Sequence, residues 1–576
     1  MKKGSITIYI SLVFVSVLLL ISIVIESTRI NVVQTECKSF TYLAADSVLA
    51  GYVRQVYEDY GILLVWEDKS LKEQLMKYIQ ANINLADLNI GGTNFMTTRL
   101  SGVSIEKKEE ISANGGEVFI NQVSSYMKYA VVTESVNKLI NLYSSNSNQK
   151  EYDTTEYMTN EPEEKSSQIS EIVKEIHDEI GNLKEEDIKE KLKTERKRTR
   201  FLKNINDIMN KIDVYREERK EFLKENTGLS DSDYMDSNFE ILEHIKNKIE
   251  EEELNVSGNS KENWVNIGEE IEQQINNLTV NTPTREDEKN KNIYENAKEL
   301  FEKSVLSMVI QDTSNISSSA IADSNLPSKK ESNKKDSIDN MSDKAKLIMY
   351  GGLKFGNYHA VKKKSALSYE LEYIIAGKDN DRSNLTATIE QMVGIRNMAT
   401  IGYLITAQEK MAQLSAIASS ATAVIGLPFL EPVIKGILME AWALAEAVND
   451  VKIIMAGEKI DILKNRDNWK TSLQNLFSGK VRGSQKKSAV NYEQFCYLLM
   501  MKQDIHIIAL RMLDLIQVNI KKNYHGSFDI HQCICGFQIT ARYETEPLFA
   551  AMPWVIHQMG QKMGAYEFSV TCKDGY

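Results

Sequence analysis

The sequence has few prolines, cysteines and histidines, and each scarcity excludes a class of protein. Seven prolines in 576 residues argue against an architecture of many strands and turns. Five cysteines are too few for a disulfide scaffold. The seven histidines include no HExxH pair, so we do not expect a catalytic zinc ion. Long helices rich in Lys, Glu, Ile and Met remain, and we predict a mainly α protein.

Motifs of common catalytic sites are missing as well. The sequence contains neither a G-x-x-x-x-G-K-[ST] phosphate loop nor a G-x-S-x-G nucleophile turn. Its acidic runs read as solvated helix faces. We therefore predict that the protein is not an enzyme, with no catalytic residues, no cofactor and no metal. The net charge of -12 and the pI of 5.4 disfavour nucleic acid as a partner.

The longest apolar run lies near the N-terminus. Residues 6–25 carry no charge and, as a helix, they match the roughly 30 Å core of a bilayer. Lys2 and Lys3 precede the run and Glu26 follows it, so the positive-inside rule places residues 1–5 in the cytoplasm and the bulk outside. A cleaved signal is the alternative, but its apolar region would be shorter, about 7 to 15 residues. We expect a single-pass protein of the cell membrane, with the bilayer as the partner of this run.

The segment that follows the run has the pattern of one more stretch of the same helix. It contains no proline, and its apolar residues are three or four positions apart, from Ile30 to Val53. We predict that the helix continues to about Tyr60 as a stem. Residues 26–144 then hold the stem and the first part of a head, and the stem is also a candidate surface for a homo-oligomer.

The middle of the chain changes in composition. Residues 145–310 are charged, and apolar positions repeat every three or four residues in two stretches, which predicts a helical or coiled-coil insertion. Residues 311–344 are rich in Ser, Asn, Lys and Asp, and we predict a disordered linker there. Residues 345–525 read as a helical domain. Within it, residues 412–430 are uncharged and are either a second membrane span or part of a buried helical pair, which we favour.

The last segment, residues 526–576, has strand character. Apolar and polar residues alternate from Cys533 to Glu544 and again from Tyr566 to Cys572, a period of two. A weaker strand signal surrounds Val103. Two strands alone are only marginally stable, so we predict that the strands and the stem close one α+β head.

The C-terminal cysteines allow three interpretations. Cys533 and Cys535 are two residues apart in a predicted strand, which puts both thiols on one face. They serve there as buried thiols, or they form a cross-strand disulfide, for which Cys535 and Cys572 are the pair. A metal site beside His531 is the third interpretation.

Several stretches resemble a Firmicutes family of single-span membrane proteins of unknown function. They are "KKGSITIYISLVFVSVLLLISIVIESTRI", "AADSVLAGYVRQVYEDYGILLVWED", "GGEVFINQVSSYMKY", "LSYELEYIIAGKDNDRSNL", "EAWALAEAV" and "CICGFQI". Members are similar to TadE/TadG-type proteins of tight-adherence (Flp) pilus loci. The resemblance implies a pilin-like or pseudopilin-like structural component with pilus or envelope assembly proteins as partners. A single-span sensor or adhesion protein with a coiled-coil arm, or an envelope enzyme, is the alternative.

The same resemblance raises the question of N-terminal processing. Prepilins are cut after a glycine and carry Glu at the fifth mature position. In this chain Gly4 is the candidate processing position, and cleavage there would place Tyr9 where those prepilins have Glu. The sequence leaves processing after Gly4 open.

Overall fold

The computed structural model describes most of the chain, and the described residues fall into two compact units. The described ranges are 3–67, 70–85, 89–90, 93–94, 97–130, 133–147, 163–225, 233–255, 260–280, 284–330, 340–425, 427–476, 483–486, 488–549 and 564–576. Unit 1 is built from three segments, Met1–Ser144, Asn315–Thr388 and Glu493–Tyr576. Unit 2 consists of Ser145–Ser314 and Ile389–Tyr492. The head of unit 1 therefore needs both ends of the chain.

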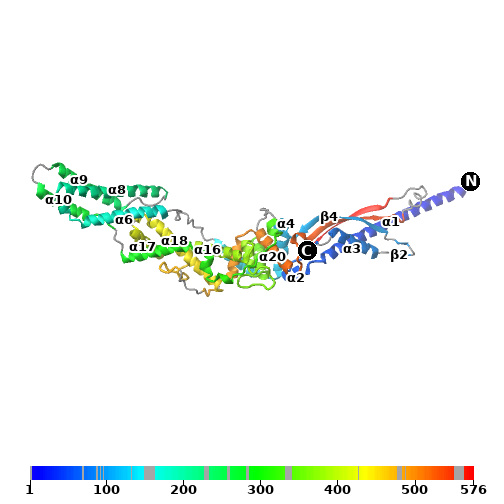
Figure 1. Cartoon of the computed structure of the whole chain (residues 1–576). Coiled ribbons are helices and arrows are strands. Elements are labelled where there is room, and N and C mark those ends of the chain that lie inside the picture. The colour runs from blue at the N-terminus through cyan, green and yellow to red at the C-terminus, as the bar shows by residue number, and fades with distance from the viewer. Residues whose placement is uncertain are drawn as a thin grey trace. The chain divides into compact units, whose positions relative to one another are not determined.

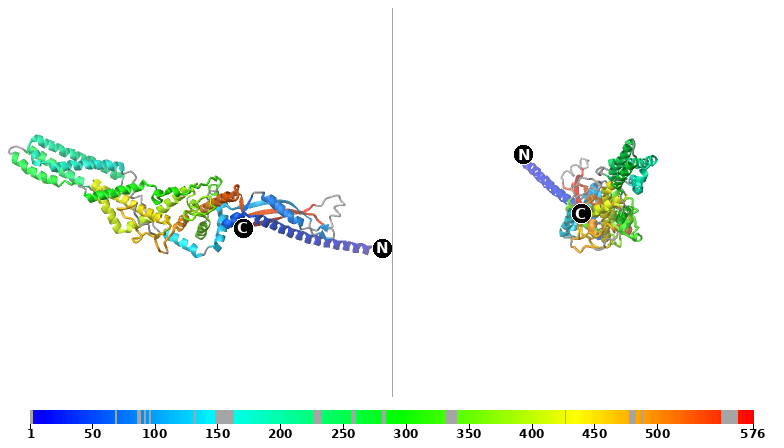
Figure 2. Two further views of the ribbon diagram at one scale, coloured as in Figure 1. Left: turned by 60° about the horizontal axis from the view of Figure 1, so that its bottom comes forward. Right: turned by 90° about the vertical axis from the view of Figure 1, so that its left-hand side faces the viewer.

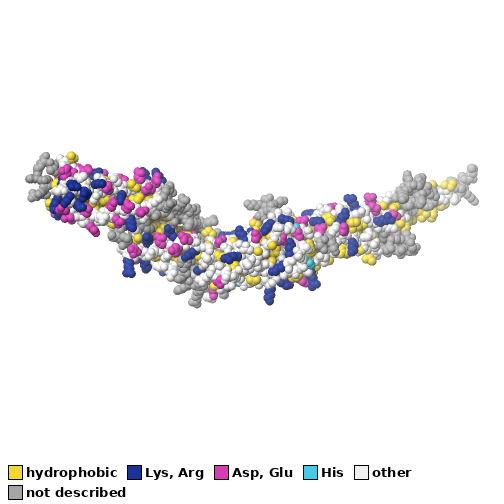
Figure 3. All heavy atoms as spheres, in the orientation of Figure 1, with side chains coloured by type: hydrophobic (Ala, Val, Ile, Leu, Met, Phe, Trp, Pro, Cys, Tyr) yellow, Lys and Arg dark blue, Asp and Glu magenta, His cyan; other side chains and the backbone are white. Residues whose placement is uncertain are grey.

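Helix α1 (Lys3–Leu49) is the longest helix of unit 1, and at 1.5 Å per residue its 47 residues extend about 70 Å. Its N-terminal part runs beyond the sheet (Figures 1 and 2) and is covered by hydrophobic side chains (Figure 3). The most apolar window has a mean hydropathy of 3.0 and none of it is buried. Among the described residues this is the one helix long and apolar enough to cross a membrane.

The stem helix ends earlier than we predicted, at Leu49 in place of Tyr60. The hydroxyl of Tyr576, the residue after the last strand, donates a hydrogen bond to the Leu49 carbonyl. A turn at residues 50–51 then leads to a separate short helix, α2 (Arg54–Tyr60). Gly61 ends α2 with φ 72°, and Tyr126 lies where a Cβ would be, so both backbone and space require glycine.

A four-stranded antiparallel sheet forms the β part of unit 1. β5 (Cys533–Thr545) lies at its centre, with β4 (Thr98–Glu110) along one edge. β6 (Tyr566–Gly575) and the short β1 (Val65–Trp66) share the other edge. Both strands predicted near the C-terminus and the strand predicted around Val103 are present. The predicted α+β fold class, mainly α with a small antiparallel sheet, is confirmed.

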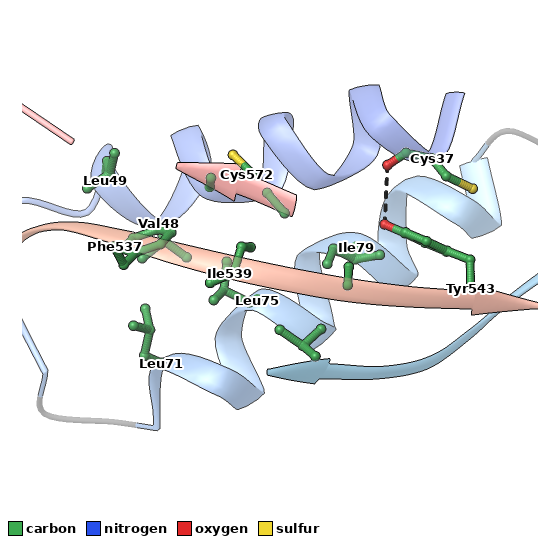
Figure 4. Close-up of a cluster of buried hydrophobic side chains, with 14 of the residues drawn as sticks. Cys37, Val48, Leu49, Leu71, Leu75, Ile79, Phe537, Ile539, Tyr543 and Cys572 are labelled. Atoms are coloured by element: carbon green, nitrogen blue, oxygen red, sulfur yellow. Dashed lines mark hydrogen bonds between the residues drawn. The ribbon is translucent and has the colours of Figure 1, made fainter. Parts of the chain in front are cut away.

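Helix α1 and α3 (Leu71–Leu85) cover one face of this sheet. Alternate residues of β5, from Phe537 to Tyr543, point into the core between them (Figure 4). The core also contains Val33, Cys37, Ala44, Ala45, Val48, Leu49, Val65, Leu71, Leu75, Ile79, Val103, Ile534 and Cys572. The apolar side chains that alternate along β5 pack in this core against those spaced three or four residues apart along α1.

Helices cover the end of the sheet where β5 begins. α20 (Ile505–Asn523) is their centre and packs against α4 (Ala113–Ala130), α14 (Met341–Lys354) and α15 (Glu370–Ala376). Nearly every position of α20 from Ile505 to Ile520 is buried. The remaining elements of unit 1 are β2 (Asn89–Ile90), β3 (Thr93–Asn94), α13 (Pro327–Lys330), the short 3-10 helix η4 (Ile530–Gln532) and most of α5 (Thr133–Ser147).

The predicted linker at 311–344 differs from the structure over much of its length. Residues 313–315 form a 3-10 turn, α13 follows, and residues from 341 onward already belong to α14. Leu326 is 1% exposed, and the Ser328 amide donates to Asp514 at 3.0 Å. A few apolar anchors and polar contacts thus order a stretch whose average composition indicated disorder. Residues 331–339 lie outside the described residues.

The named elements among the described residues of unit 2 are helices, and they form two groups. α6 (Glu163–Glu185), α8 (Glu195–Glu225), α9 (Tyr234–Asn255) and α10 (Ser260–Asn276) lie side by side, with the short α7 (Ile188–Leu192) between α6 and α8 (Figures 1 and 2). The periodic apolar positions of the predicted insertion are buried in this bundle, among them Val173, Ile176, Ile205 and Ile212. Acidic and basic side chains are interspersed on its surface (Figure 3).

The second group consists of α11 (Arg285–Phe301), α12 (Val305–Val309), α17 (Gln408–Ile425) and α18 (Glu431–Met455), joined by the part of α16 (Asp381–Thr406) that belongs to unit 2. α17 packs between α11 and α18, and the 3-10 turn η3 (Pro428–Leu430) connects α17 to α18. The uncharged run 412–430 therefore contributes to a helical core. The helix before α20, α19 (Tyr492–Met501), belongs to unit 1 except for Tyr492.

Candidate functional site

The first candidate site is the boundary between the apolar run and the stem. Glu26 and Arg29 are both buried, at 4% and 7% exposure, and they form an ion pair at 2.6 Å. Arg29 also donates to the Glu546 carbonyl at 2.7 Å, and Glu26 accepts from the Phe549 amide at 2.8 Å. The pair thereby links the turn of α1 at residues 26–29 to the segment that follows β5. Because each charge is hydrogen-bonded, removing either one would leave its partner buried and unpaired.

A second set of hydrogen bonds joins the stem to β5 further along. The Tyr543 hydroxyl donates to the Cys37 carbonyl at 3.2 Å (Figure 4) and lies 2.7 Å from the Thr41 hydroxyl. Tyr543 is fully buried and stacks on Phe568 of β6. The buried positions of the stem, from Glu26 to Leu49, thus follow one face of the helix.

The opposite side of the stem carries exposed apolar residues. Val32 is 49% exposed, Leu43 is 48% exposed and Tyr42 is 39% exposed. Ile25, Val32, Ser39 and Leu43 are separated by seven, seven and four residues, so they share one face of the helix. This row continues the exposed apolar surface of residues 6–25 into the part that packs on the head.

None of the five cysteines, all of which the structure describes, forms a disulfide, and all five are buried. Cys572 pairs in register with Ile539, four residues along β5 from Cys535. That offset corresponds to about 13 Å, well beyond the roughly 7 Å limit between disulfide-bonded Cα atoms. The predicted Cys535–Cys572 disulfide therefore does not fit the register. Burial raises the pKa of the Cys535 thiol to about 12, so this thiol is protonated and unreactive at neutral pH.

A cavity of about 360 Å³ lies among helices of unit 1. It is bounded by the end of α2, the end of α14, the loop at residues 355–369 and the last two turns of α20. Its lining residues are Asp59, Tyr60, Tyr126, Leu353, Lys354, Lys362, Lys364, Ser365, Glu370, Asn519, Ile520 and Asn523. The size is within the range of small-ligand pockets.

Glu370 is the most buried polar residue in the lining of this cavity, with 1% of its surface exposed. Its carboxylate accepts hydrogen bonds from the Gly356 amide and the Asn519 side-chain amide, each at 2.7 Å. Burial raises the pKa of the Glu370 carboxyl to about 7, although these two hydrogen bonds act to lower it. Both oxygens are engaged in holding the 355–369 loop on α20, so we assign Glu370 a structural role.

Unit 2 contains a buried cluster of charges between α16, α18 and the segment after α18. Asp450 accepts from Arg396 at 2.6 Å and from Lys464 at 2.8 Å, and Lys470 lies 3.5 Å away. Glu446, one turn before Asp450, pairs with Lys464 at 2.5 Å and accepts from the backbone amide of Thr471. The cluster fastens residues 462–471 to α18.

A lysine between two indole rings adjoins this cluster. The Lys410 ammonium lies 4.3 Å from the Trp442 ring centre and 4.1 Å from that of Trp469. Burial lowers the pKa of Lys410. Lys410, Arg466, Tyr403 and Trp469 line a second cavity of about 360 Å³. Cation–π contacts of this kind stabilise packing, and they account for the position of Lys410 without a ligand.

Sequence reasoning named few site residues, and the structure adds most of those described above. Gly4 lies in the first turn of α1, and cleavage after it stays a prediction. His531 lies in η4 and Cys533 begins β5. Among the described residues no three His, Cys, Asp or Glu side chains are grouped to hold a metal. Glu370 and Asp450 had no distinguishing local motif. The only signal was a carboxylate inside an apolar helix, as in "EAWALAEAVND".

One family model matches part of the chain. Residues 283–545 match the model of DUF5702, a family of unknown function. The match begins before α11 and ends with β5, so it includes Glu370 and the Asp450 cluster. It leaves α1 outside, together with the cavity-lining residues Asp59, Tyr60 and Tyr126. No curated protein and no solved structure matches the chain.

Proposed function

We propose that the protein is a membrane-anchored extracytoplasmic structural or assembly component of a Tad/Flp-type pilus or a related envelope apparatus. It acts through protein–protein packing and not through catalysis. The observation that carries this proposal is the division of α1. Residues 6–25 are apolar and exposed, whereas residues 26–49 bury one face against α3 and the sheet. One rigid helix thus joins a bilayer anchor to a folded head.

The proposal assigns an orientation and a partner surface. The N-terminus lies in the cytoplasm, because Lys2 and Lys3 precede the apolar run, and both units lie outside. The exposed row of Ile25, Val32 and Leu43 packs against other stems or other pilin-type helices. Exposed apolar residues that continue a lipid-facing surface favour helix–helix association at the membrane boundary.

A deletion experiment tests the proposed function. In a strain with Tad/Flp-type pili, loss of the gene should reduce the number of filaments counted by electron microscopy and should reduce surface adhesion. Restoring the full-length gene should return both. Unchanged filament number and adhesion in the deletion strain would mean that the proposal is wrong.

A pair of matched variants tests the packing surface itself. Val32→Glu with Leu43→Glu places two charges on the exposed apolar row, and we expect filaments and stem–stem cross-links to fall at least tenfold. Asn31→Glu with Gln34→Glu adds the same charge at exposed polar positions of the same helix, and should leave both near the wild-type level. Equal behaviour of the two double variants would exclude the row as the contact surface.

A further inference from the structure

Three lysines border the cavity of unit 1. Lys354 ends α14, and Lys362 and Lys364 belong to the 355–369 loop. Within the described part of the chain none of the three forms a salt bridge. Lys354 donates to the Asp59 carbonyl at 3.0 Å, Lys364 donates to the Tyr524 hydroxyl at 2.8 Å, and Lys362 lies 3.5 Å from the Leu353 carbonyl.

The two carboxylates of the cavity interact electrostatically with lysines, Asp59 with Lys364 and Glu370 with Lys362, but they accept hydrogen bonds from other groups. Asp59 accepts a hydrogen bond from the Tyr524 hydroxyl at 3.0 Å. Glu370 accepts from the Gly356 amide and the Asn519 side chain. Three cations and two carboxylates therefore border one concave surface, and the cations are in excess. A cleft lined mainly by one sign of charge attracts ions of the opposite sign.

The arrangement of the donors selects among anions. The ammonium groups come from two elements of the cavity wall, and each is a compact point charge that donates in several directions. A tetrahedral phosphate accepts from several such donors at once, whereas a planar carboxylate is matched best by the fork of an arginine. The lining residues of this cavity include no arginine.

We propose that the cavity bounded by Lys354, Lys362 and Lys364 binds a phosphate group. Its volume of about 360 Å³ accommodates a small phosphate ester or one unit of a glycerol-phosphate polymer. The site would give the head a ligand in addition to its protein partners, and it does not depend on the proposed pilus role. Neither the family match nor the sequence motifs assign a ligand here.

Calorimetric titration of the full chain in detergent micelles tests the site. The probes are inorganic phosphate, glycerol phosphate and a poly(glycerol phosphate) chain, each at low ionic strength. The variant Lys362→Gln with Lys364→Gln removes two exposed cations of the cavity, and an unchanged melting temperature will show that it folds. We expect its Kd for the bound probe to rise at least tenfold.

The control variant is Lys330→Gln with Lys363→Gln, which removes the same charge from exposed positions outside the cavity. Its Kd should stay within twofold of the wild-type value. Binding of the small esters identifies a free phosphate compound as the ligand, whereas binding of the polymer alone identifies a polymeric one. The proposal fails if no probe binds the wild-type protein, or if both double variants lose affinity equally.

Discussion

Glu370 in unit 1 and Asp450 in unit 2 are buried to the same degree, but the pKa of Glu370 is raised and that of Asp450 is lowered. Each is 1% exposed. Burial raises the pKa of both carboxyls, and for Glu370 it prevails, so that its pKa reaches about 7. For Asp450 the neighbouring cations Arg396 and Lys464 outweigh burial, and the pKa falls below its ordinary value. The difference lies in what surrounds each carboxylate.

The hydrogen-bond donors to the two carboxylates differ in charge. Glu370 accepts hydrogen bonds from neutral amide groups, which satisfy its oxygens but carry no positive charge. Asp450 accepts from a guanidinium and an ammonium, both buried with it. Two buried carboxylates of equal exposure can therefore stabilise a fold in different ranges of pH.

The largest effect should come from removing the charge of Asp450. Asp450→Ala leaves Arg396 and Lys464 buried with only Glu446 to compensate them, which lowers the free energy of unfolding by about 3 to 5 kcal/mol. Urea unfolding followed by tryptophan fluorescence measures this change, since Trp442 and Trp469 adjoin the cluster. The exposed Asp467→Ala serves as the control, with an expected change within about 0.5 kcal/mol. A loss below about 1 kcal/mol for Asp450→Ala would contradict the ionic account of this cluster.

A smaller and pH-dependent effect is expected at Glu370. Its folded-state pKa of about 7 lies above the ordinary 4.5, so the native state binds the proton more tightly than the unfolded state. The stability that this group contributes is complete below pH 4.5 and is lost as pH rises to about 7, a change of roughly 3 kcal/mol at most. Glu370→Gln, which is neutral at every pH, should flatten this decline.

Free energies of unfolding measured between about pH 5 and pH 8 test this sign. For Asp450 the sign is reversed: its contribution is present above the ordinary pKa of 3.8 and is lost as pH falls through the lower folded-state value. Asp450→Asn should therefore leave the slope between pH 5 and pH 8 unaltered. If Glu370→Gln has the same slope as the wild-type protein, the buried carboxyl is not the group that titrates.

The elements of the fold were more predictable than these sites, because each element repeats a signal along the chain. The uncharged residues 6–25 indicated the exposed part of α1, and the period of two from Cys533 to Glu544 indicated β5. The end of the stem was missed, since the contact of Tyr576 with Leu49 joins residues from the two chain ends. The predicted Cys535–Cys572 disulfide does not fit, because the register of β5 and β6 is a tertiary property that the sequence pattern does not give.

The partners of buried charges are distant in sequence, which explains why both clusters escaped prediction. Arg396 lies 54 positions from Asp450, and Asn519 lies 149 positions from Glu370. In the sequence each of these residues lies in a helical stretch, and no local motif identifies its distant partner. The segment 313–330 was assigned to a linker for a related reason: its few anchors, such as Leu326, are outweighed in any average over composition.

The smallest effect concerns Lys470, which borders the Asp450 cluster without being essential to it. Its side chain is 17% exposed and lies 3.5 Å from Asp450, whereas that of Lys464 is 1% exposed and lies 2.8 Å away. Burial lowers the pKa of Lys470 in spite of Asp450, so the cost of burying the ammonium exceeds the gain from pairing. Lys470→Met should change the free energy of unfolding by about 1 kcal/mol or less. Lys464→Met should cost about 3 kcal/mol, because it leaves Glu446 and Asp450 with fewer cations. Equal losses for the two variants, measured by urea unfolding, would show that proximity to Asp450 alone, and not burial of the pair, sets the energy.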